Sequence, residues 1–352
     1  MYDIFKNKII IVTGSTGFKG SWLCFWLKKL GAKVVGIGLK PEKGSVIFKS
    51  LNLHKEIEQN YINICEFEKL NKIIKKIKPE IIFHLAAQSV VSESYYDPLF
   101  TLNTNIIGSA NILEACRKNK IKNLIYITSD KCYLNKEFKK GYKEEDELGG
   151  LDNYSSSKAA AEIIFKSYYE SYFKNLKNLS TVSARAGNVI GGGDFKKNRI
   201  VPDVIKSFNS NKILYLRSPL ATRPWQHVLE PLNGYLKLAE LILSRKLKHN
   251  LIPNWNFGPN RKNCKNVRQI VDMIAKEWGV KPKIINLSKE KRFKETNLLS
   301  LNIKKAEKEL NWKPKLNMQQ TIKLTVEWYK NFFKKKNMKE ISNNQIEMFE
   351  EL

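Results

Sequence analysis

Residues 9–20 read Ile9-Ile10-Ile11-Val12-Thr13-Gly14-Ser15-Thr16-Gly17-Phe18-Lys19-Gly20. The first four are a continuous apolar run, which is typical of a parallel strand buried on both faces. Glycines follow at positions 14, 17 and 20, and the apolar segment from Trp22 to Leu27 continues as a helix. A strand, a glycine turn and a helix in this order predict a dinucleotide site, in which backbone N–H groups and the helix N-terminus hold a pyrophosphate.

Strand-like and helix-like segments alternate beyond this unit. Strands are predicted at residues 33–39, 61–64, 79–88, 123–128 and 179–184, with helices at 67–77, 103–118 and from Tyr154 onward. Further helices are predicted at residues 229–243, 267–278, 303–310 and 318–333. The alternation favours an α/β fold with a doubly wound parallel sheet of the Rossmann type.

The composition of the sequence changes at Arg185, which predicts a second domain. From there the sequence is rich in glycine and in predicted loops. We expect a Rossmann domain of residues 1–184 plus about 224–250, and a smaller, loop-rich α/β substrate domain of about 185–223 and 251–333. The remaining segment, 334–352, runs basic, then polar, then acidic, and is expected to be a mobile tail or a peripheral helix.

Length and composition indicate a cytoplasmic globular protein. The 352 residues suffice for a full core, the start is not signal-like, and no apolar stretch approaches the roughly 20 residues of a spanning helix. The five cysteines are widely spaced and form no paired motif. Reduced thiols are therefore expected, without a disulfide framework, a metal site or a membrane partner.

The charge balance is strongly basic. There are 62 Lys and Arg against 34 Asp and Glu, a net charge of +28. Such an excess raises the possibility of nucleic-acid binding. The lysines are spread along nearly every segment, which favours solvated faces and no nucleic-acid partner. A non-enzymatic protein that binds nucleic acid or senses a cofactor stays an alternative, to be recognised by salt-dependent binding without turnover.

Two polar motifs carry the predicted chemistry. Tyr154 and Lys158 lie four residues apart, on one face of a helix, so the ammonium can favour the ionised phenol and make it a base for a hydroxyl proton. Ser129, Asp130 and Lys131 follow the strand predicted at 123–128, where ligands of an open parallel sheet bind.

Arginines and glycines of the loop-rich part suit a phosphorylated ligand. Arg199 and Arg217 follow the glycine-rich segment 186–194, and Arg223 stands two residues before Trp225. Arginine is a bidentate partner for phosphate, and glycine lets the backbone approach a ligand closely.

The end of the second predicted strand lacks the expected acidic residue. An Asp or Glu usually binds the adenosine ribose there. Gly38, Leu39 and Lys40 occupy the position instead. Lys40 leaves NADP open beside NAD.

The motifs together resemble the extended short-chain dehydrogenase/reductase family of NAD-dependent epimerases and dehydratases. The likeness covers Phe5 to about Pro259. The stretches that carry it are 17–22 (Gly-Phe-Lys-Gly-Ser-Trp), 128–133 (Thr-Ser-Asp-Lys-Cys-Tyr), 183–194 (Ser-Ala-Arg-Ala-Gly-Asn-Val-Ile-Gly-Gly-Gly-Asp) and 223–231 (Arg-Pro-Trp-Gln-His-Val-Leu-Glu-Pro).

The resemblance implies an NAD-dependent 4,6-dehydratase that acts on a nucleotide sugar, CDP-glucose, in the biosynthesis of deoxysugars for O-antigen or capsule polysaccharide. It implies a homodimer or tetramer. Tyr154 and Lys158 are then the oxidising pair, assisted by Ser129, with Asp130 as acid and Lys131 as base of the elimination. A sugar-nucleotide 4-epimerase, or a 4,6-dehydratase for another nucleotide sugar, remains the alternative.

The same resemblance implies the binding residues. Those for the cofactor are Gly14, Thr16, Gly17, Phe18, Gly20, Asn63, Ile64, Leu85, Ala86, Ala87, Tyr154 and Lys158. Those for the substrate are Gln88, Asn188, Arg199, Arg217 and Arg223. Asn63 stands where many relatives place an aspartate near the adenine.

Overall fold

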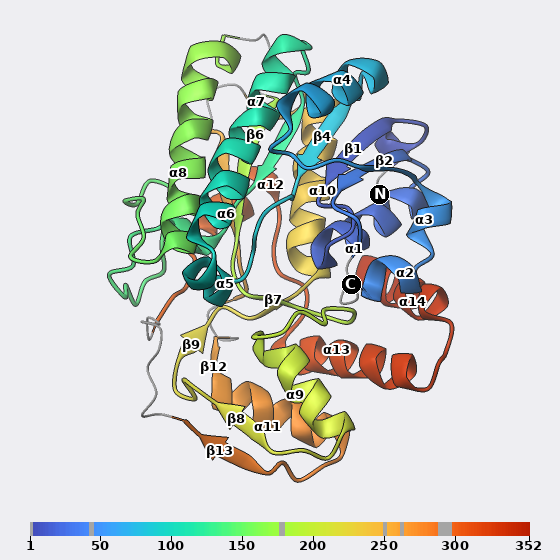
Figure 1. Cartoon of the computed structure of the whole chain (residues 1–352), viewed down its shortest axis with the longest axis vertical. Helices are drawn as coiled ribbons and strands as arrows, with labels where there is room; N and C mark the ends of the chain where they lie inside the picture. The colour runs from blue at the N-terminus through green and yellow to red at the C-terminus, as the bar shows by residue number, and fades with distance from the viewer. Residues whose placement is uncertain (1–2, 42–45, 176–179, 249–251, 261–263, 288–297) are drawn as a thin grey trace.

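The protein is built around a seven-stranded parallel sheet (Figure 1). The computed structural model describes residues 3–352 except 42–45, 176–179, 249–251, 261–263 and 288–297. The strands are β1 (Ile9–Thr13), β2 (Lys33–Gly38), β3 (Glu58–Tyr61), β4 (Ile81–His84), β5 (Leu124–Ile127), β6 (Thr181–Ala186) and β11 (Asn254–Phe257). Their order is β11-β6-β5-β4-β1-β2-β3, and every pairing is parallel. The predicted doubly wound Rossmann sheet is confirmed.

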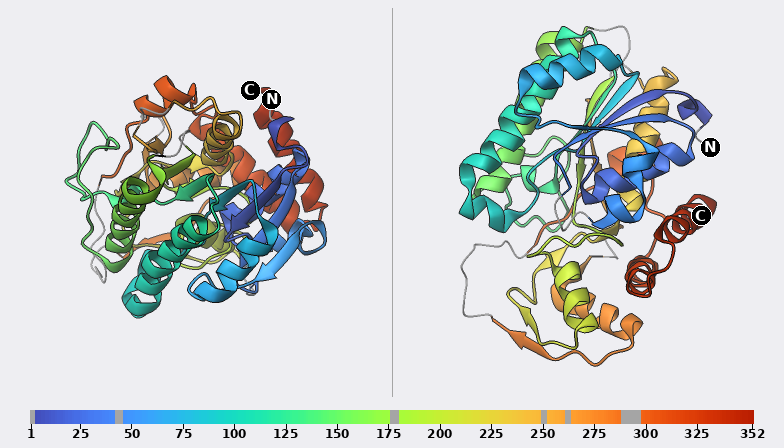
Figure 2. Two further views of the ribbon diagram at one scale, coloured as in Figure 1. Left: turned by 90° about the horizontal axis from the view of Figure 1, so that it is seen from above. Right: turned by 45° about the vertical axis from the view of Figure 1, so that its right-hand side comes forward.

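Helices cover both faces of the sheet (Figure 2). One layer holds α4 (Phe67–Ile77), α5 (Val91–Tyr96), α6 (Pro98–Leu102), η2 (Asn103–Gly108), α7 (Ser109–Lys118), α8 (Asn153–Tyr168) and η4 (Tyr169–Phe173). The other holds α1 (Phe18–Lys29), α10 (Leu229–Leu243) and α12 (Lys304–Leu310), with the short α2 (Val46–Ser50) and α3 (Leu53–Glu56) beside α1. Both faces of the sheet are therefore shielded from water, as expected for strands that are continuously apolar.

A smaller part of the chain lies beyond the carboxyl ends of the strands, at the bottom of Figure 1. Its helices are α9 (Ile200–Asn209), α11 (Val267–Trp278) and α13 (Met318–Phe333). Its strands pair two by two: β7 (Val189–Ile190) with β10 (Gln226–His227), β8 (Leu214–Leu216) with β13 (Ile284–Asn286), and β9 (Thr222–Arg223) with β12 (Lys265–Asn266).

The glycine-rich segment 191–193 joins the two parts tightly. The Trp22 indole N–H donates to the Gly192 carbonyl at 2.9 Å, and Trp22 is fully buried. A Cβ on Gly192 would lie 1.9 Å from the Trp328 ring, so only glycine fits between the indoles of α1 and α13.

The last helix, α14 (Met338–Glu351), packs against α1. Phe349 is fully buried and meets Trp26 edge-on at 5.8 Å between ring centroids. The Trp26 indole N–H donates to the Glu350 carboxylate at 2.7 Å. This aromatic contact fixes the end of the chain to the outer side of the glycine-turn helix.

Two elements differ from their sequence-based prediction. The third strand lies at Glu58–Tyr61 and not at 61–64, because it is an edge strand without a fully buried residue and carries no apolar signal. The helix predicted over 103–118 opens with six residues of π-helix, η2. Among the described helices, none is long and apolar enough to cross a bilayer.

Candidate active site

A cleft of about 870 Å³ opens where the carboxyl ends of the central strands face the smaller part of the chain. Residues that follow β4, β5 and β6 line its upper side, and α9, β8 and β9 contribute to the lower side. The strand order reverses between β1 and β4, which is where an open α/β sheet binds its ligands. All five residues predicted to be catalytic line this cleft.

The glycine turn after β1 has the shape of a dinucleotide cradle. Gly14 has a φ of +71°, and a Cβ on Gly20 would lie 2.0 Å from the Gly14 carbonyl oxygen. A Cβ on Gly14 would lie 2.8 Å from the backbone nitrogen of Ala86. A Cβ at either position would clash with backbone, so only glycine lets the turn pack against the segment after β4 and against α1. This close packing sets the backbone of the turn at the N-terminus of α1, where a pyrophosphate can bind.

The residues around the expected ribose position are neutral or basic. The Thr16 hydroxyl donates to the Leu39 carbonyl at 3.1 Å, and the Ser15 hydroxyl donates to Gln59 at 2.8 Å. Lys40 is exposed at the end of β2. Asn63 and Ile64 follow the carboxyl end of β3, and the Asn63 side chain accepts the Cys65 N–H at 3.0 Å.

The strand β4 ends in small residues beside the glycine turn. Leu85, Ala86 and Ala87 are half-buried, and the Ala86 N–H donates to the Thr13 hydroxyl at 3.1 Å. His84, just before them, is buried between the hydroxyls of Thr13 and Ser109 at 2.8 and 3.0 Å. Burial lowers the His84 pKa to about 3, so this neutral imidazole is a structural group.

The segment after β5 brings Ser129, Asp130 and Lys131 to the cleft. Ser129 caps the short helix η3 (Asp130–Cys132), and its hydroxyl donates to Asp130 Oδ1 at 2.9 Å. Asp130 Oδ2 is buried and has no hydrogen-bond partner among the described residues. Burial raises the Asp130 pKa, although the nearby Lys131 charge opposes the shift. A carboxyl group held this way favours its protonated form and can donate a proton.

The helix α8 presents Tyr154 and Lys158 one turn apart. Its N-cap is Asp152, whose side chain accepts the Ser155 N–H at 2.9 Å, and both Tyr154 and Lys158 are buried. Burial lowers the Lys158 pKa to about 7, helped by the positive charge of Lys19. Burial also raises the Tyr154 pKa to about 12, with the Ser129 hydroxyl acting in the opposite direction. Desolvation therefore opposes the ionisation of this phenol that Lys158 was expected to favour.

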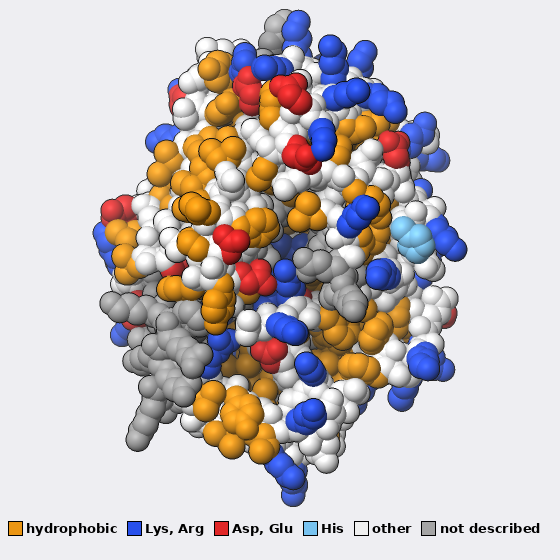
Figure 3. All heavy atoms as spheres, in the orientation of Figure 1, with side chains coloured by type: hydrophobic (Ala, Val, Ile, Leu, Met, Phe, Trp, Pro, Cys, Tyr) orange, Lys and Arg blue, Asp and Glu red, His pale blue; other side chains and the backbone are white. Residues whose placement is uncertain are grey.

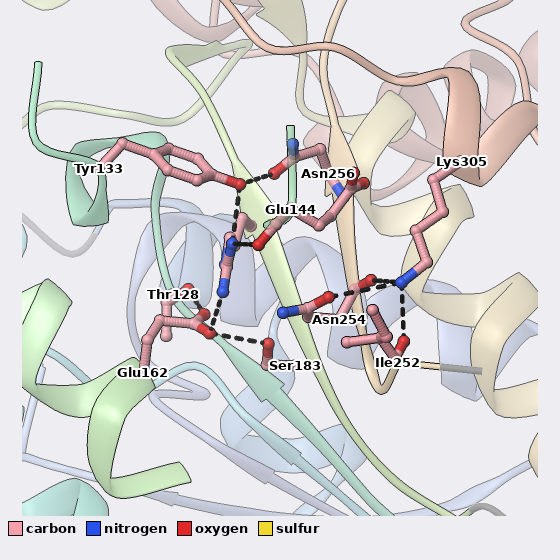
Figure 4. A network of polar contacts seen from close by, with 10 residues as sticks. Thr128, Tyr133, Glu144, Glu162, Ser183, Ile252, Asn254, Asn256 and Lys305 are labelled. Atoms are coloured by element: carbon pink, nitrogen blue, oxygen red, sulfur yellow. Dashed lines mark hydrogen bonds and ion pairs between the residues drawn. The ribbon is translucent and has the colours of Figure 1, made fainter. Parts of the chain in front are cut away.

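A buried ion pair joins β6 to α8, the helix that carries Tyr154 and Lys158 (Figure 4). Arg185 of β6 donates to Glu162 of α8 at 2.7 Å, and the same carboxylate accepts from Ser183 at 3.0 Å and from Thr128. Arg185 also donates to the Tyr133 hydroxyl at 2.8 Å. The network ties the end of β5 to the helix that carries Tyr154.

The residues predicted to bind the substrate divide into two groups. Asn188, Arg199, Arg217 and Arg223 line the cleft. Arg199 pairs with Asp194 at 2.8 Å and donates to the Ser89 hydroxyl at 2.7 Å. Gln88 does not line the cleft: its buried side-chain amide donates to Val90 and Thr101 at 3.0 and 2.9 Å. This amide supports the backbone after β4.

Lys19, Glu162 and Arg185 belong to the site but were not predicted to have a role in it. Glu162 stands four residues after Lys158, which places it on the same face of α8. Lys19 lies inside the glycine motif and lines the cleft. The helical spacing was a usable signal for Glu162, whereas the burial of Arg185 requires the sheet to be known.

The chain belongs to the family whose model is described as GDP-mannose 4,6 dehydratase, which matches residues 11–325. It is 39% identical over 349 residues to a CDP-glucose 4,6-dehydratase of Salmonella typhimurium, covering 98% of this chain and 96% of that protein. It is 24% identical to a UDP-glucose 4-epimerase of Mycoplasma genitalium, over 93% of this chain and 98% of that protein.

Solved structures share the fold. A dTDP-glucose 4,6-dehydratase of Bacillus anthracis in complex with NAD superposes with a TM-score of 0.75 at 25% identity, covering 92% of this chain and 97% of that one. A UDP-glucuronic acid 4-epimerase of Bacillus cereus gives a TM-score of 0.79 at 23% identity, with coverage of 92% and 99%.

Proposed function

We propose that this protein is an NAD-dependent hydro-lyase that converts CDP-D-glucose to CDP-4-dehydro-6-deoxy-D-glucose. One observation carries the reaction type: Asp130, with its raised pKa and unpartnered Oδ2, lines the same cleft as Lys131, Tyr154 and Lys158. Oxidation or epimerisation at C4 needs only the Tyr154 and Lys158 pair. Elimination of water needs an acid and a base as well, and Asp130 and Lys131 supply them.

The residues divide the proton transfers among them. Tyr154 takes the proton of the sugar 4-hydroxyl, with the Ser129 hydroxyl assisting. The 4-keto group acidifies the proton on C5, and Lys131 removes it. Asp130 donates a proton to the departing 6-hydroxyl, which leaves as water. When C6 is reduced, C5 regains its proton from Lys131. NAD, when bound, supplies a hydride acceptor at C4 and a hydride donor at C6.

The glycine turn would hold NAD, and the loop-rich part would hold the nucleotide sugar. The turn of Gly14, Gly17 and Gly20 would bind the cofactor through its backbone, with Thr16, Phe18, Asn63, Ile64 and residues 85–87 around it. Residues 1–184 and about 224–250 thus serve the cofactor, together with β11 and α12, which belong to the central sheet and its helix layer; the rest of about 185–223 and 251–333 serves the substrate. Asn188, Arg199, Arg217 and Arg223 face the expected diphosphate and sugar.

The choice of cytosine rests on similarity. The Salmonella typhimurium relative, 39% identical over nearly the full length of both proteins, is named for CDP-glucose. Relatives named for dTDP-glucose and UDP-glucose are 24 to 31% identical. The epimerase relatives make 4-epimerisation of a nucleotide sugar the second candidate.

We further propose a homodimer formed through the layer of α5, α6, η2 and α8. Figure 3 shows hydrophobic side chains gathered over these helices, in the upper left of the view. Leu99 is 75% exposed, Ile107 51% and Ile163 56%. Helix faces with several exposed aliphatic side chains mark a protein interface. Leu99→Glu is expected to convert the assembly to monomers in light scattering, and a wild-type monomer would refute the dimer.

Assays with CDP-, dTDP-, GDP- and UDP-glucose test the function. Product ketone is detected by its absorbance in alkali, and a 4-epimer by chromatography. Ketone from CDP-glucose at the highest kcat/KM supports the proposal. A 4-epimer as sole product would establish the second candidate instead.

A further inference from the structure

Lys19 is a cation of the cleft that has no anionic partner among the residues that the structure describes. It is the second residue of α1, directly after the glycine turn, and it lines the cleft with Asp130, Lys158 and Arg199. Its Nζ lies 5.9 Å from the centroid of the Tyr235 ring. Among the described residues, no carboxylate is within ion-pair distance of this ammonium, and no hydrogen bond to it is formed.

The surroundings of Lys19 carry an excess of positive charge. Lys158 and Arg199 lie near enough to influence Lys19 or to be influenced by it. Arg199 already has Asp194 as its counter-ion, at 2.8 Å. Asp130 attracts Lys19, but burial raises the Asp130 pKa and favours the neutral acid. A half-buried ammonium beside two other cations is costly unless an anion joins it.

We propose that Lys19 is a diphosphate-binding residue of the cleft, whose ammonium pairs with phosphate oxygens of a bound nucleotide. The inference rests on the proposed function, because NAD and a nucleotide sugar each carry a diphosphate. Position supports it: Lys19 lies in the first turn of α1, directly after the glycine turn, and the N-terminus of such a helix is where a pyrophosphate binds. The ammonium is a compact charge suited to phosphate.

Lys19 would add to the cleft an interaction with the ligand that the end of β2 does not provide. Gly38, Leu39 and Lys40 provide no carboxylate for the ribose. A charge-assisted contact to the diphosphate would compensate for that missing hydrogen-bond partner. Burial, Arg199 and Lys158 all oppose the charge on Lys19, and burial with Arg199 lowers its pKa to about 8. An anionic ligand would raise this pKa and favour the protonated form.

Equilibrium binding of two probes to full-length protein, freed of co-purified nucleotide, tests the inference. NADH and CDP are titrated by calorimetry into wild type, Lys19→Met and Lys19→Arg, with adenosine and cytidine as probes that lack phosphate. Lys33→Met is the matched control, because Lys33 is exposed at the start of β2, at the end of the strand away from Gly38. Thermal unfolding of each variant establishes that it is folded.

Lys19→Met is expected to weaken one diphosphate probe by roughly ten- to hundredfold, as loss of a hydrogen bond to a charged group does. Loss confined to NADH assigns Lys19 to the cofactor diphosphate, and loss confined to CDP assigns it to the nucleotide sugar. Adenosine and cytidine should bind unchanged, and Lys19→Arg should retain most of the affinity.

Two results separate failure of this inference from failure of the proposed function. Binding of both probes to Lys19→Met within about twofold of wild type, or an equal loss in Lys33→Met, would overturn the role of Lys19. A folded wild-type protein that binds neither NADH nor CDP would overturn the proposed function and this inference with it.

Discussion

The Glu162 carboxylate lies 2.7 Å from the Arg185 guanidinium, and at most 3% of either side chain is exposed. The pair joins α8 to β6, and Thr128 donates a further hydrogen bond to Glu162 from the end of β5. Two predicted motifs, the one beginning at Ser129 and the one at Tyr154, are therefore attached to a single buried carboxylate. Their relative position depends on that group.

Removing the charge of Glu162 should destabilise the protein strongly. Glu162→Gln keeps the size of the side chain and leaves Arg185 as a buried, unpaired cation. Breaking a buried pair from one side costs about 3–5 kcal/mol. Urea unfolding followed by circular dichroism measures the loss.

Glu170→Gln is the matched control. Glu170 pairs with Lys174 at 2.7 Å on the surface, with both side chains about half exposed. Exposed pairs of this kind contribute roughly 0.3–0.5 kcal/mol. Equal losses of unfolding free energy in the two variants would show that burial does not increase the contribution of the Glu162 pair to stability.

Lys131→Met should stop elimination and leave oxidation intact. The variant lacks the base for the C5 proton, so formation of the final product should fall by about 10²–10⁴-fold. Rapid mixing with CDP-glucose should still show the absorbance of the reduced nicotinamide, because Tyr154 and Lys158 are unchanged.

Tyr154→Phe is the informative comparison for that experiment, since it should abolish the absorbance change as well. Lys139→Met, at an exposed position of the same loop, should behave as wild type. Product formation by Lys131→Met near the wild-type rate would remove Lys131 from the elimination.

Stability should fall between about pH 5 and pH 7 because of Glu230. This carboxyl group at the start of α10 is 1% exposed, and its Oε1 accepts the N–H groups of Lys315 and Leu316 at 2.9 and 2.6 Å. Burial raises its pKa from 4.5 to about 7. The folded state therefore holds a proton that the unfolded chain has released across this interval.

The contribution of that proton is full below the unfolded pKa and is lost as the pH rises through the folded one. At about 1.4 kcal/mol per pKa unit, the loss amounts to roughly 3 kcal/mol. Glu230→Gln keeps the Oε1 acceptor and cannot ionise, so its unfolding free energy should not show this decline. Parallel pH curves for the two proteins would mean that Glu230 has an ordinary pKa.

Much of the fold could be read from local sequence signals. The helices predicted at 229–243, 267–278 and 318–333 have those bounds in α10, α11 and α13. Apolar periodicity marks such helices because each buries one face. The edge strand β3 was misplaced because its residues are half-buried or exposed and show no alternation of apolar and polar side chains.

The site was less accessible from the sequence where it depends on distant contacts. The motifs containing Asp130 and Tyr154 could be recognised because each lies in a short stretch. The Arg185 partners Glu162, Tyr133 and Glu144 are 23, 52 and 41 residues away along the chain. Such pairings exist only once the sheet brings the segments together. Burial of the Tyr154 phenol, which raises its pKa, is likewise a property of the assembled cleft.

Transfer of deuterium within CDP-glucose tests the dehydration most directly. Wild-type protein is incubated with CDP-glucose that carries deuterium at C4, and the product is examined by mass spectrometry and NMR. We predict a 4-keto-6-deoxy sugar with the label moved to C6. Label retained at C4, in unchanged sugar or in its 4-epimer, would contradict the account.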